Sequence, residues 1–435
     1  MELVRTEAET GLISLSEEAK IDGPAWLKEL QETARAEFQA KGLPNRRVEE
    51  WKYTDLKSAM KVAFKPVDQG DVTEAQINEQ LGAELAAIST HKLVFVDGQL
   101  NEQLSDCSLG ELSEVLSLKA ALADDVSWVQ SIGTVQQNER DAVQALNLAL
   151  MQGGAAIKIA DRHELNKPIH LIFVSTATSE SSVASRLFFE IGAAAKVEII
   201  ESHISLEDKP SQTNLVTEVL VGDWAKVRHV KFTNDHKESV HLSNVIGKLG
   251  KEADYGLFQA TLDGGLTRNQ VEIRYDGDEA KADISGVALL SGKSHADLTL
   301  VMDHAALSCE SRELFKTVLD DEGRAVFQGK VIVQPGAQKT DGEMMSKALL
   351  LSETAEFDSK PELEIYADDV LCGHGATTGQ IDDDLLFYLK ARGVPDEEAR
   401  SLLIQAFVGE ALELIENDDL RDYVINQTLA WYEKA

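Results

Sequence analysis

The sequence is poor in cysteine, aromatic side chains and positive charge. Its 435 residues include three cysteines and 6% aromatic residues. Three cysteines are too few for a disulfide framework. There is no Cys-x-x-Cys pair, so we expect no structural zinc ribbon. Hydrophobic residues still make up 43% of the chain, which excludes wholesale disorder and predicts a core of Val, Ile, Leu and Ala.

Positive charge is also scarce, with 42 Lys and Arg against 75 Asp and Glu, a net charge of −33. Such a field repels a phosphate backbone and an anionic membrane surface, so nucleic acid and membranes are excluded as partners. No apolar run approaches the roughly 18 residues that a membrane span needs. The first twenty residues hold no apolar stretch typical of a secretory signal. We therefore expect a cytoplasmic protein of two or three domains.

The segment 1–150 is predicted to be a mostly helical N-terminal domain. Apolar residues from Trp26 to Phe38 recur at helical spacing, and Gly42 with Pro44 ends that helix. A strand and turn are expected at 93–98, and a short apolar helix at 141–151.

The segment 151–381 alternates apolar and polar residues with period two, which is typical of strands with one buried face. Strands are expected to start near residues 271, 284, 298, 313 and 325, too close together for crossover helices. A sandwich and a β-solenoid both fit this pattern. The near-even spacing favours the solenoid, in which each coil stacks on its neighbours.

The segment 382–435 is predicted to be helical again. The run Asp382 to Asp384 suits a helix N-terminus, and Gly393 and Pro395 separate two helices. Because an amphipathic helix needs an apolar surface to cover, we expect this segment to dock a partner and its deletion to leave the solenoid folded. The expected apolar stripe consists of Leu403, Phe407, Ala411 and Leu414.

Three motifs are candidates for chemistry. Gly292-Lys293-Ser294 lacks the earlier glycine of a phosphate-binding loop, so a turn is the better interpretation. His229, His236 and His241 lie near Asp235, but their spacing fixes no metal geometry, and solvated histidines are the simpler interpretation.

The third motif, Cys372-Gly373-His374-Gly375, is more informative. In an extended segment Cys372 and His374 point to one face, and the glycines allow another molecule to approach. A thiolate and an imidazole bind iron or zinc. A buried cysteine beside a turn histidine remains the alternative.

Several ordered motifs resemble the SufB/SufD family of scaffold subunits in the Suf iron–sulfur cluster assembly system. The resemblance covers about residues 20–435 and is weakest between 60 and 150. No cysteine lies between Glu310 and Leu371, where SufB carries the cysteine on which clusters are thought to be built, so the chain is similar to the SufD type. The motifs are Glu50-Trp51-Lys52-Tyr53-Thr54, Phe327-Gln328-Gly329-Lys330-Val331, Pro361 to Val370, Cys372 to Thr377, Leu385 to Leu389 with Arg392-Gly393, and Ala406-Phe407.

This resemblance implies a right-handed parallel β-helix between helical ends, in a complex with a SufB-like subunit and a SufC-like ABC-type ATPase. It implies a non-catalytic subunit with no tightly bound cofactor and with ATP only on the ATPase. His374, with Cys372, would contribute to a transient iron or iron–sulfur cluster site at the SufB interface. Whether the chain pairs with itself when alone is left open. The implied ATPase-docking candidates are Leu385, Phe387, Tyr388, Arg392, Leu403 and Phe407.

Two other functions are weighed against this one. A carbohydrate-active β-helix enzyme would use paired carboxylates as acid and base. Such enzymes are often secreted, and the sequence shows no secretory signal. A metal-dependent enzyme built around His374 is the third interpretation.

Overall fold

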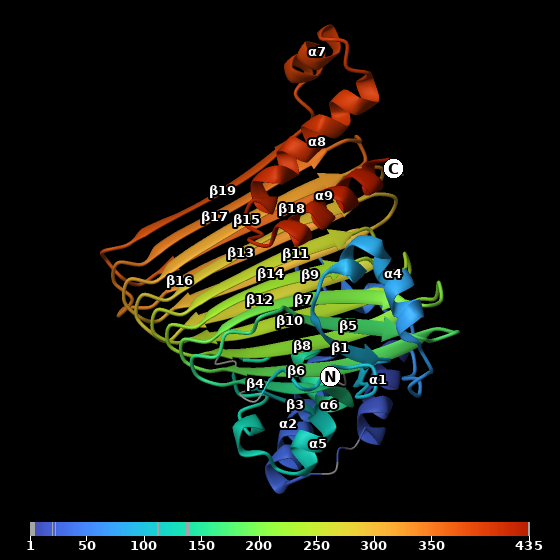
Figure 1. The fold of residues 1–435 in the computed structure, drawn as a ribbon, viewed down its shortest axis with the longest axis vertical. Helices are drawn as coiled ribbons and strands as arrows, with labels where there is room; N and C mark the ends of the chain where they lie inside the picture. Colours follow the sequence, from blue (N-terminus) through green and yellow to red (C-terminus); the bar gives the residue numbers. More distant parts are fainter. Residues whose placement is uncertain (1–4, 20, 22, 111–112, 136–138, 434–435) are drawn as a thin grey trace.

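The computed structural model describes residues 5–433 except 20, 22, 111–112 and 136–138. A tall stack of strands occupies the centre, with helices around its N-terminal end and a C-terminal helix, α7 (Asp383–Ala391), standing beyond its other end (Figure 1). From β4 onward, consecutive strands alternate between a ten-stranded and a nine-stranded sheet, and each pairs in parallel with the strands two places away along the chain. This is a parallel β-solenoid, as the even strand spacing predicted, and not a sandwich of hairpins.

The register of the stack is regular. Leu266 pairs with His295, and His295 with Arg324, so each of these coils adds 29 residues. The Gly292-Lys293-Ser294 segment is a turn between two strands, in which Gly292 has a φ of 59°. That positive φ suits glycine. The interpretation of this tripeptide as a turn is therefore confirmed.

The strands are β1 (His91–Val96), β2 (Gln99–Leu100), β3 (Ser113–Ser117), β4 (Gly153–Ile159), β5 (Ile169–Ser175), β6 (Ser181–Ile191), β7 (Lys196–Ser205), β8 (Ser211–Val221), β9 (Lys226–Thr233), β10 (Val240–Leu249), β11 (Asp254–Leu262), β12 (Leu266–Tyr275), β13 (Lys281–Leu290), β14 (His295–His304), β15 (Glu310–Leu319), β16 (Arg324–Val333), β17 (Asp341–Leu350), β18 (Glu356–Ile365) and β19 (Leu371–Gly379). Strands β1 and β3 extend the two sheets, so the sheets begin inside the segment predicted to be mostly helical. The predicted division at residue 150 therefore does not separate the sheets from the helices.

The main core lies between the two sheets. Alternate residues of each strand point inward, and most are Val, Ile, Leu or Ala, as the composition predicted. Fully burying one such Val, Leu or Ile side chain stabilises the fold by about 1.5–3 kcal/mol. Each coil therefore stabilises its neighbours by rows of stacked aliphatic side chains.

The N-terminal helices cover the outer face of the nine-stranded sheet. They include α1 (Glu7–Glu18), α2 (Ala25–Lys41), α5 (Leu118–Ala123) and α6 (Ala142–Leu150). Leu27 and Leu122, for example, share an apolar cluster with Phe188 and Val216 of the sheet. Helix α2 ends at Gly42, as predicted.

The outer face of the ten-stranded sheet is covered by α4 (Glu74–Ala87), α8 (Asp396–Leu412) and α9 (Asp418–Tyr432). Ile404, Val408 and Trp431 are buried in one cluster with sheet residues such as Val230 and Phe258. Deletion of 382–435 would expose this apolar face. The expectation that the solenoid folds without the segment stays a prediction.

The apolar stripe of α8 also differs from the prediction. The buried residues are Ala399, Ile404, Val408, Ala411 and Leu412, whereas Leu414 is exposed. The stripe covers the chain's own sheet, so it needs no partner surface.

Candidate functional site at the open end of the solenoid

The stack ends at β18 and β19, the last strands of the two sheets. Tyr366 N donates to Val333 O, and Leu371 N donates to Thr340 O. Because N–H directions alternate along a strand, odd residues of β18 and even residues of β19 point their N–H groups away from the stack. The free N–H groups of β19 include those of Cys372 and His374. This end of the solenoid is an unpaired edge to which another strand can add.

Cys372 and His374 both lie on β19, where alternation places their side chains on one face, as the spacing predicted. Cys372 pairs with Gly342 and His374 with Met344 on the preceding coil. Met344 belongs to the main core, and Cys372 packs against it, so this face points into the solenoid. Cys372 is half-buried, whereas His374 is exposed at the mouth.

The two glycines of the motif differ. A Cβ at Gly373 would meet nothing within 4 Å, so this position leaves open space beside His374. A Cβ at Gly375 would lie 2.6 Å from Met345 Cε, so a larger residue there requires the Met345 side chain to shift. Gly373 therefore fits the predicted role of leaving room for another molecule.

Burial raises the pKa of the Cys372 thiol, and the carboxylates of Asp341 and Glu313 add to the effect. The thiol is therefore protonated in the isolated chain at neutral pH, and a metal ion or a base from a partner is needed to form the thiolate. Cys309 is fully buried, and burial raises its pKa to about 11. Cys309 is thus an inert core residue.

Glu313 is an interior residue that the sequence analysis missed. It is 2% exposed, lies on β15, and pairs with Met344, which in turn pairs with His374. The Ser311 hydroxyl forms a side-chain hydrogen bond with its carboxyl group. Burial raises its pKa to about 8, and the charge of Asp283 adds to this rise. The Ser311 hydroxyl and the Arg312 guanidinium act in the opposite direction and lower the pKa. The only signal in the sequence was a glutamate at an inward position of an alternating strand.

The raised pKa gives a stability prediction. Glu313 holds its proton in the folded chain up to about pH 8, but loses it in the unfolded chain near 4.5. The folded state is therefore progressively destabilised as pH rises between these values, by on the order of 5 kcal/mol. The melting temperature of Glu313→Gln should exceed that of wild type by an amount that grows as pH rises over this range. Thermal unfolding at several pH values measures the difference, with Glu343→Gln, an exposed carboxylate, as control. A difference that does not grow with pH would contradict the prediction.

Two motifs of the sequence analysis meet on the outer face of the nine-stranded sheet. The Trp51 ring lies 3.9 Å from the Arg268 guanidinium, and Arg268 forms a buried ion pair with Asp297. Gln328 Nε2 donates to the backbone oxygen of Glu50 at 3.1 Å. The segment around Trp51 and the Phe327–Val331 motif therefore hold the N-terminal region on the solenoid, which is a structural role.

The candidate docking residues fall into two groups. On α7, Leu385, Phe387 and Tyr388 are 51%, 73% and 54% exposed. Arg392 lies over the Tyr388 ring and donates to its hydroxyl at 2.7 Å. The Asp382 side chain caps this helix, as predicted.

The other group lies on α8 and is partly used within the chain. Leu403 and Phe407 are half-buried, and the Phe407 ring lies 4.6 Å from the Lys316 ammonium. The Glu410 carboxylate on the same helix forms an ion pair with Lys347 at 3.1 Å. The exposed apolar surface of the C-terminal segment therefore centres on α7.

The histidines predicted to be solvated are in part buried. His229 and His241 are each 1% exposed, inside the solenoid. His229 and Lys231 both lie 3.2 Å from the Glu201 carboxylate, and His241 Nδ1 lies 2.8 Å from Asp235 Oδ2. Lys231 and Glu201 neutralise one another in the low-dielectric interior. Burial lowers the pKa of His241 to about 4, so its imidazole is neutral at pH 7.

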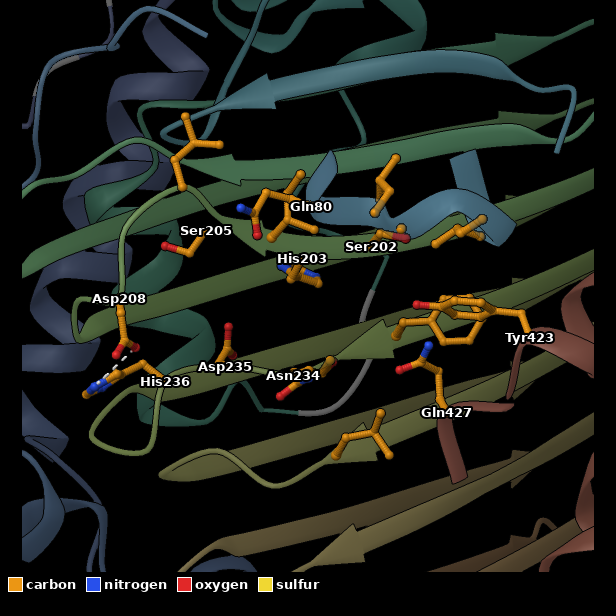
Figure 2. Close-up of a pocket in the computed structure, with 18 of the residues that line it drawn as sticks. Gln80, Ser202, His203, Ser205, Asp208, Asn234, Asp235, His236, Tyr423 and Gln427 are labelled. Carbon is orange, nitrogen blue, oxygen red and sulfur yellow. Dashed lines mark ion pairs between the residues drawn. The ribbon is translucent and has the colours of Figure 1, made fainter. Parts of the chain in front are cut away.

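A cavity of about 600 Å³ adjoins this cluster, between α4, α9 and the ends of β7 and β9. Figure 2 shows His203 and Asp235 in its floor, the Asp208–His236 ion pair at one end, and Tyr423 with Gln427 at the other. Among the described residues, no three His, Cys, Asp or Glu side chains converge closely enough to hold a metal ion.

No helix in the described part of the chain is both long and apolar enough to cross a membrane.

Comparison with known proteins finds similarity along nearly the whole chain. The family model described as "SUF system FeS cluster assembly, SufBD core domain" matches residues 173–407, and "SufBD protein N-terminal region" matches 15–171. The chain is 31% identical to the iron–sulfur cluster assembly protein SufD of Escherichia coli K12, over 88% of each chain. It is 30% identical to an iron–sulfur cluster assembly SufBD family protein of Synechocystis, over 94% of this chain and 93% of the relative. It is 25% identical to SufD of Bacillus subtilis, over 93% of each.

Proposed function

Because the chain belongs to the SufBD family of iron–sulfur cluster assembly proteins, as a SufD-type member, we propose that it is a non-catalytic scaffold subunit that pairs with a SufB-like subunit. The observation that carries the proposal is the unpaired edge at β18 and β19. A homologous solenoid has a matching end, and two such ends pair by backbone hydrogen bonds. The comparisons do not favour a carbohydrate-active enzyme.

The site at this end is proposed to take part in building a transient cluster. Cys372 and His374 supply a thiol and an imidazole on the last strand, and both ligand types suit iron. Their backbone N–H groups face the direction from which a partner strand would come. The partner would thus arrive beside both side chains, and its own residues would complete the ligand set.

ATP is proposed to be hydrolysed by a SufC-like ABC-type ATPase. In this chain the nearest approach to a phosphate-binding loop, Gly292-Lys293-Ser294, is a turn between strands. The exposed apolar surface of α7, with Phe387 at its centre, supports docking of the ATPase to that helix.

The pairing proposal predicts an effect of proline at Ile365. The Ile365 N–H points to the free edge, so Ile365→Pro removes a donor for a partner strand without breaking the β16–β18 ladder. The natural Pro361 already occupies an equivalent edge position. We expect heterodimer affinity to fall by roughly three- to tenfold, the value of about one hydrogen bond. Analytical size exclusion with the SufB-like subunit measures it. Ile365→Ala, which keeps the N–H, is the matched control, and equal assembly of both variants with an intact fold by circular dichroism would contradict the pairing.

A further inference from the structure

The cavity between α4 and α9 combines an apolar wall with a few polar groups. Apolar side chains from both helices and from the ten-stranded sheet line it, among them Leu81, Leu262 and Phe232. The Phe232 ring stands perpendicular to the Tyr423 ring of α9, with 5.0 Å between their centroids. A volume of about 600 Å³ and this mixed lining are typical of sites for small organic molecules.

The fixed charges of the cavity lining are negative. Among the described residues, the lining holds the carboxylates of Glu207, Asp208 and Asp235 with two histidines, and neither lysine nor arginine. The Asp208 side chain is 92% exposed, so this end of the cavity opens to solvent. A cavity lined by charges of one sign concentrates ligands of the opposite sign. The lining therefore favours an organic cation over a carboxylate or a phosphate.

The charge of Asp235 is not matched by the network behind it. Burial alone would raise the pKa of Asp235, but its hydrogen bond with His241 and the charge of Lys231 outweigh this effect and lower the pKa, so the carboxylate is ionised at pH 7. Lys231 itself lies 3.2 Å from the Glu201 carboxylate and is paired with it. One negative charge therefore remains, and a cation on the cavity side of Asp235 would stabilise it.

Thr233 adds a polar group without a partner. This residue is 2% exposed and lines the same cavity at the end of β9. No described residue forms a hydrogen bond with its hydroxyl oxygen. A buried hydroxyl without a hydrogen bond costs free energy, and a donor placed in the cavity would remove that cost. An ammonium group carries three donors, enough for Thr233 and Asp235 together.

We propose that this cavity binds a small organic amine, whose ammonium group contacts Asp235 and Thr233 and whose apolar body packs against Phe232 and Tyr423. Aromatic faces add to the attraction for the cation. The site is separate from the open end of the solenoid, so the proposal is independent of the scaffold function.

A bound amine would also join the two terminal regions of the chain. Helix α4 belongs to the N-terminal region and α9 to the C-terminal segment, and both line the cavity. The two helices already meet through a hydrogen bond of 3.1 Å from Asn426 Nδ2 to Glu84 Oε1. Because the amine binds only when both helices are in place, it should raise the melting temperature as its concentration rises.

The test is isothermal titration calorimetry of the full chain with phenethylamine, a small amine with an aromatic body. Two matched probes are phenethyl alcohol, which lacks the charge, and hydrocinnamate, which reverses it. Wild type should bind the amine at least about tenfold more tightly than either, the value of one hydrogen bond to a charged group. Asp235→Asn should weaken amine binding by a similar factor. Thr233→Val, which keeps the shape and removes the hydroxyl, should weaken it by roughly three- to tenfold.

The matched control is Asp422→Asn, which removes an exposed carboxylate of α9 outside the cavity lining and should bind the amine as wild type does. The proposal would be overturned by no amine binding at millimolar concentration, by equal affinity for either matched probe, or by wild-type affinity in Asp235→Asn. An equal loss in Asp422→Asn would also overturn it. If circular dichroism shows that Asp235→Asn is unfolded, Thr233→Val decides, and wild-type affinity in that variant overturns the site.

Discussion

Replacing His374 with alanine should lower cluster formation by the assembled complex by at least about tenfold, while assembly and melting temperature stay nearly unchanged. The side chain is exposed at the mouth of the solenoid, so its removal creates no cavity in the core. An imidazole can ligate iron or relay a proton, a function that alanine cannot supply. Anaerobic cluster reconstitution with the SufB-like subunit and the ATPase measures the yield.

Two further variants make the His374 result specific. His236→Ala removes a histidine from the β9–β10 loop, away from the open end, and should leave cluster yield unchanged. Cys372→Ala should have a milder effect than His374→Ala, because water or another ligand can replace a single thiol in a transient site. If His374→Ala gave the same cluster yield as wild type, the site assignment would be wrong and only the scaffold function would stand. A large drop in melting temperature would instead show that the histidine acts in packing.

The β-solenoid was predictable because its periodicity is local. Inward and outward residues alternate along every strand, and the turns recur at nearly even spacing, so the pattern around Val271 to Val333 was enough to favour stacked coils. The pairing of Cys372 with His374 on one face followed from the same alternation. Both predictions needed only the distance between residues along the chain.

Features that depend on distant coils were not predictable. Helix α8 carries Leu402, Leu403 and Ile404 in succession, so several apolar stripes fit its sequence, and the sheet surface decides which one is buried. The sequence alone predicts a solvated His229, because its partner Glu201 lies one coil earlier and is brought close only by the stacking of coils. The position of Glu313 beneath Met344 and His374 likewise follows only from the register between coils.

The same helix surface determines how ATPase docking should be tested. Removal of the whole segment 382–435 would uncover the sheet face beneath α8 and α9 and would confuse loss of docking with loss of fold. A single charged residue on α7 avoids this. Phe387 is 73% exposed, so Phe387→Asp disrupts no core contact.

Phe387→Asp should reduce ATPase capture by roughly thirtyfold or more, since loss of an aromatic anchor at an interface costs about 2 kcal/mol or more. The added carboxylate also has to be desolvated against the apolar partner surface, which increases the loss. Co-purification and a binding titration with the SufC-like ATPase measure it. Leu307→Asp, at an apolar residue in the β14–β15 turn that is 47% exposed, is the control and should bind normally. Because α7 packs mainly against α8, pairing with the SufB-like subunit should be preserved in both variants. If Phe387→Asp captured the ATPase as well as wild type does, the proposal that α7 is the docking surface would be wrong.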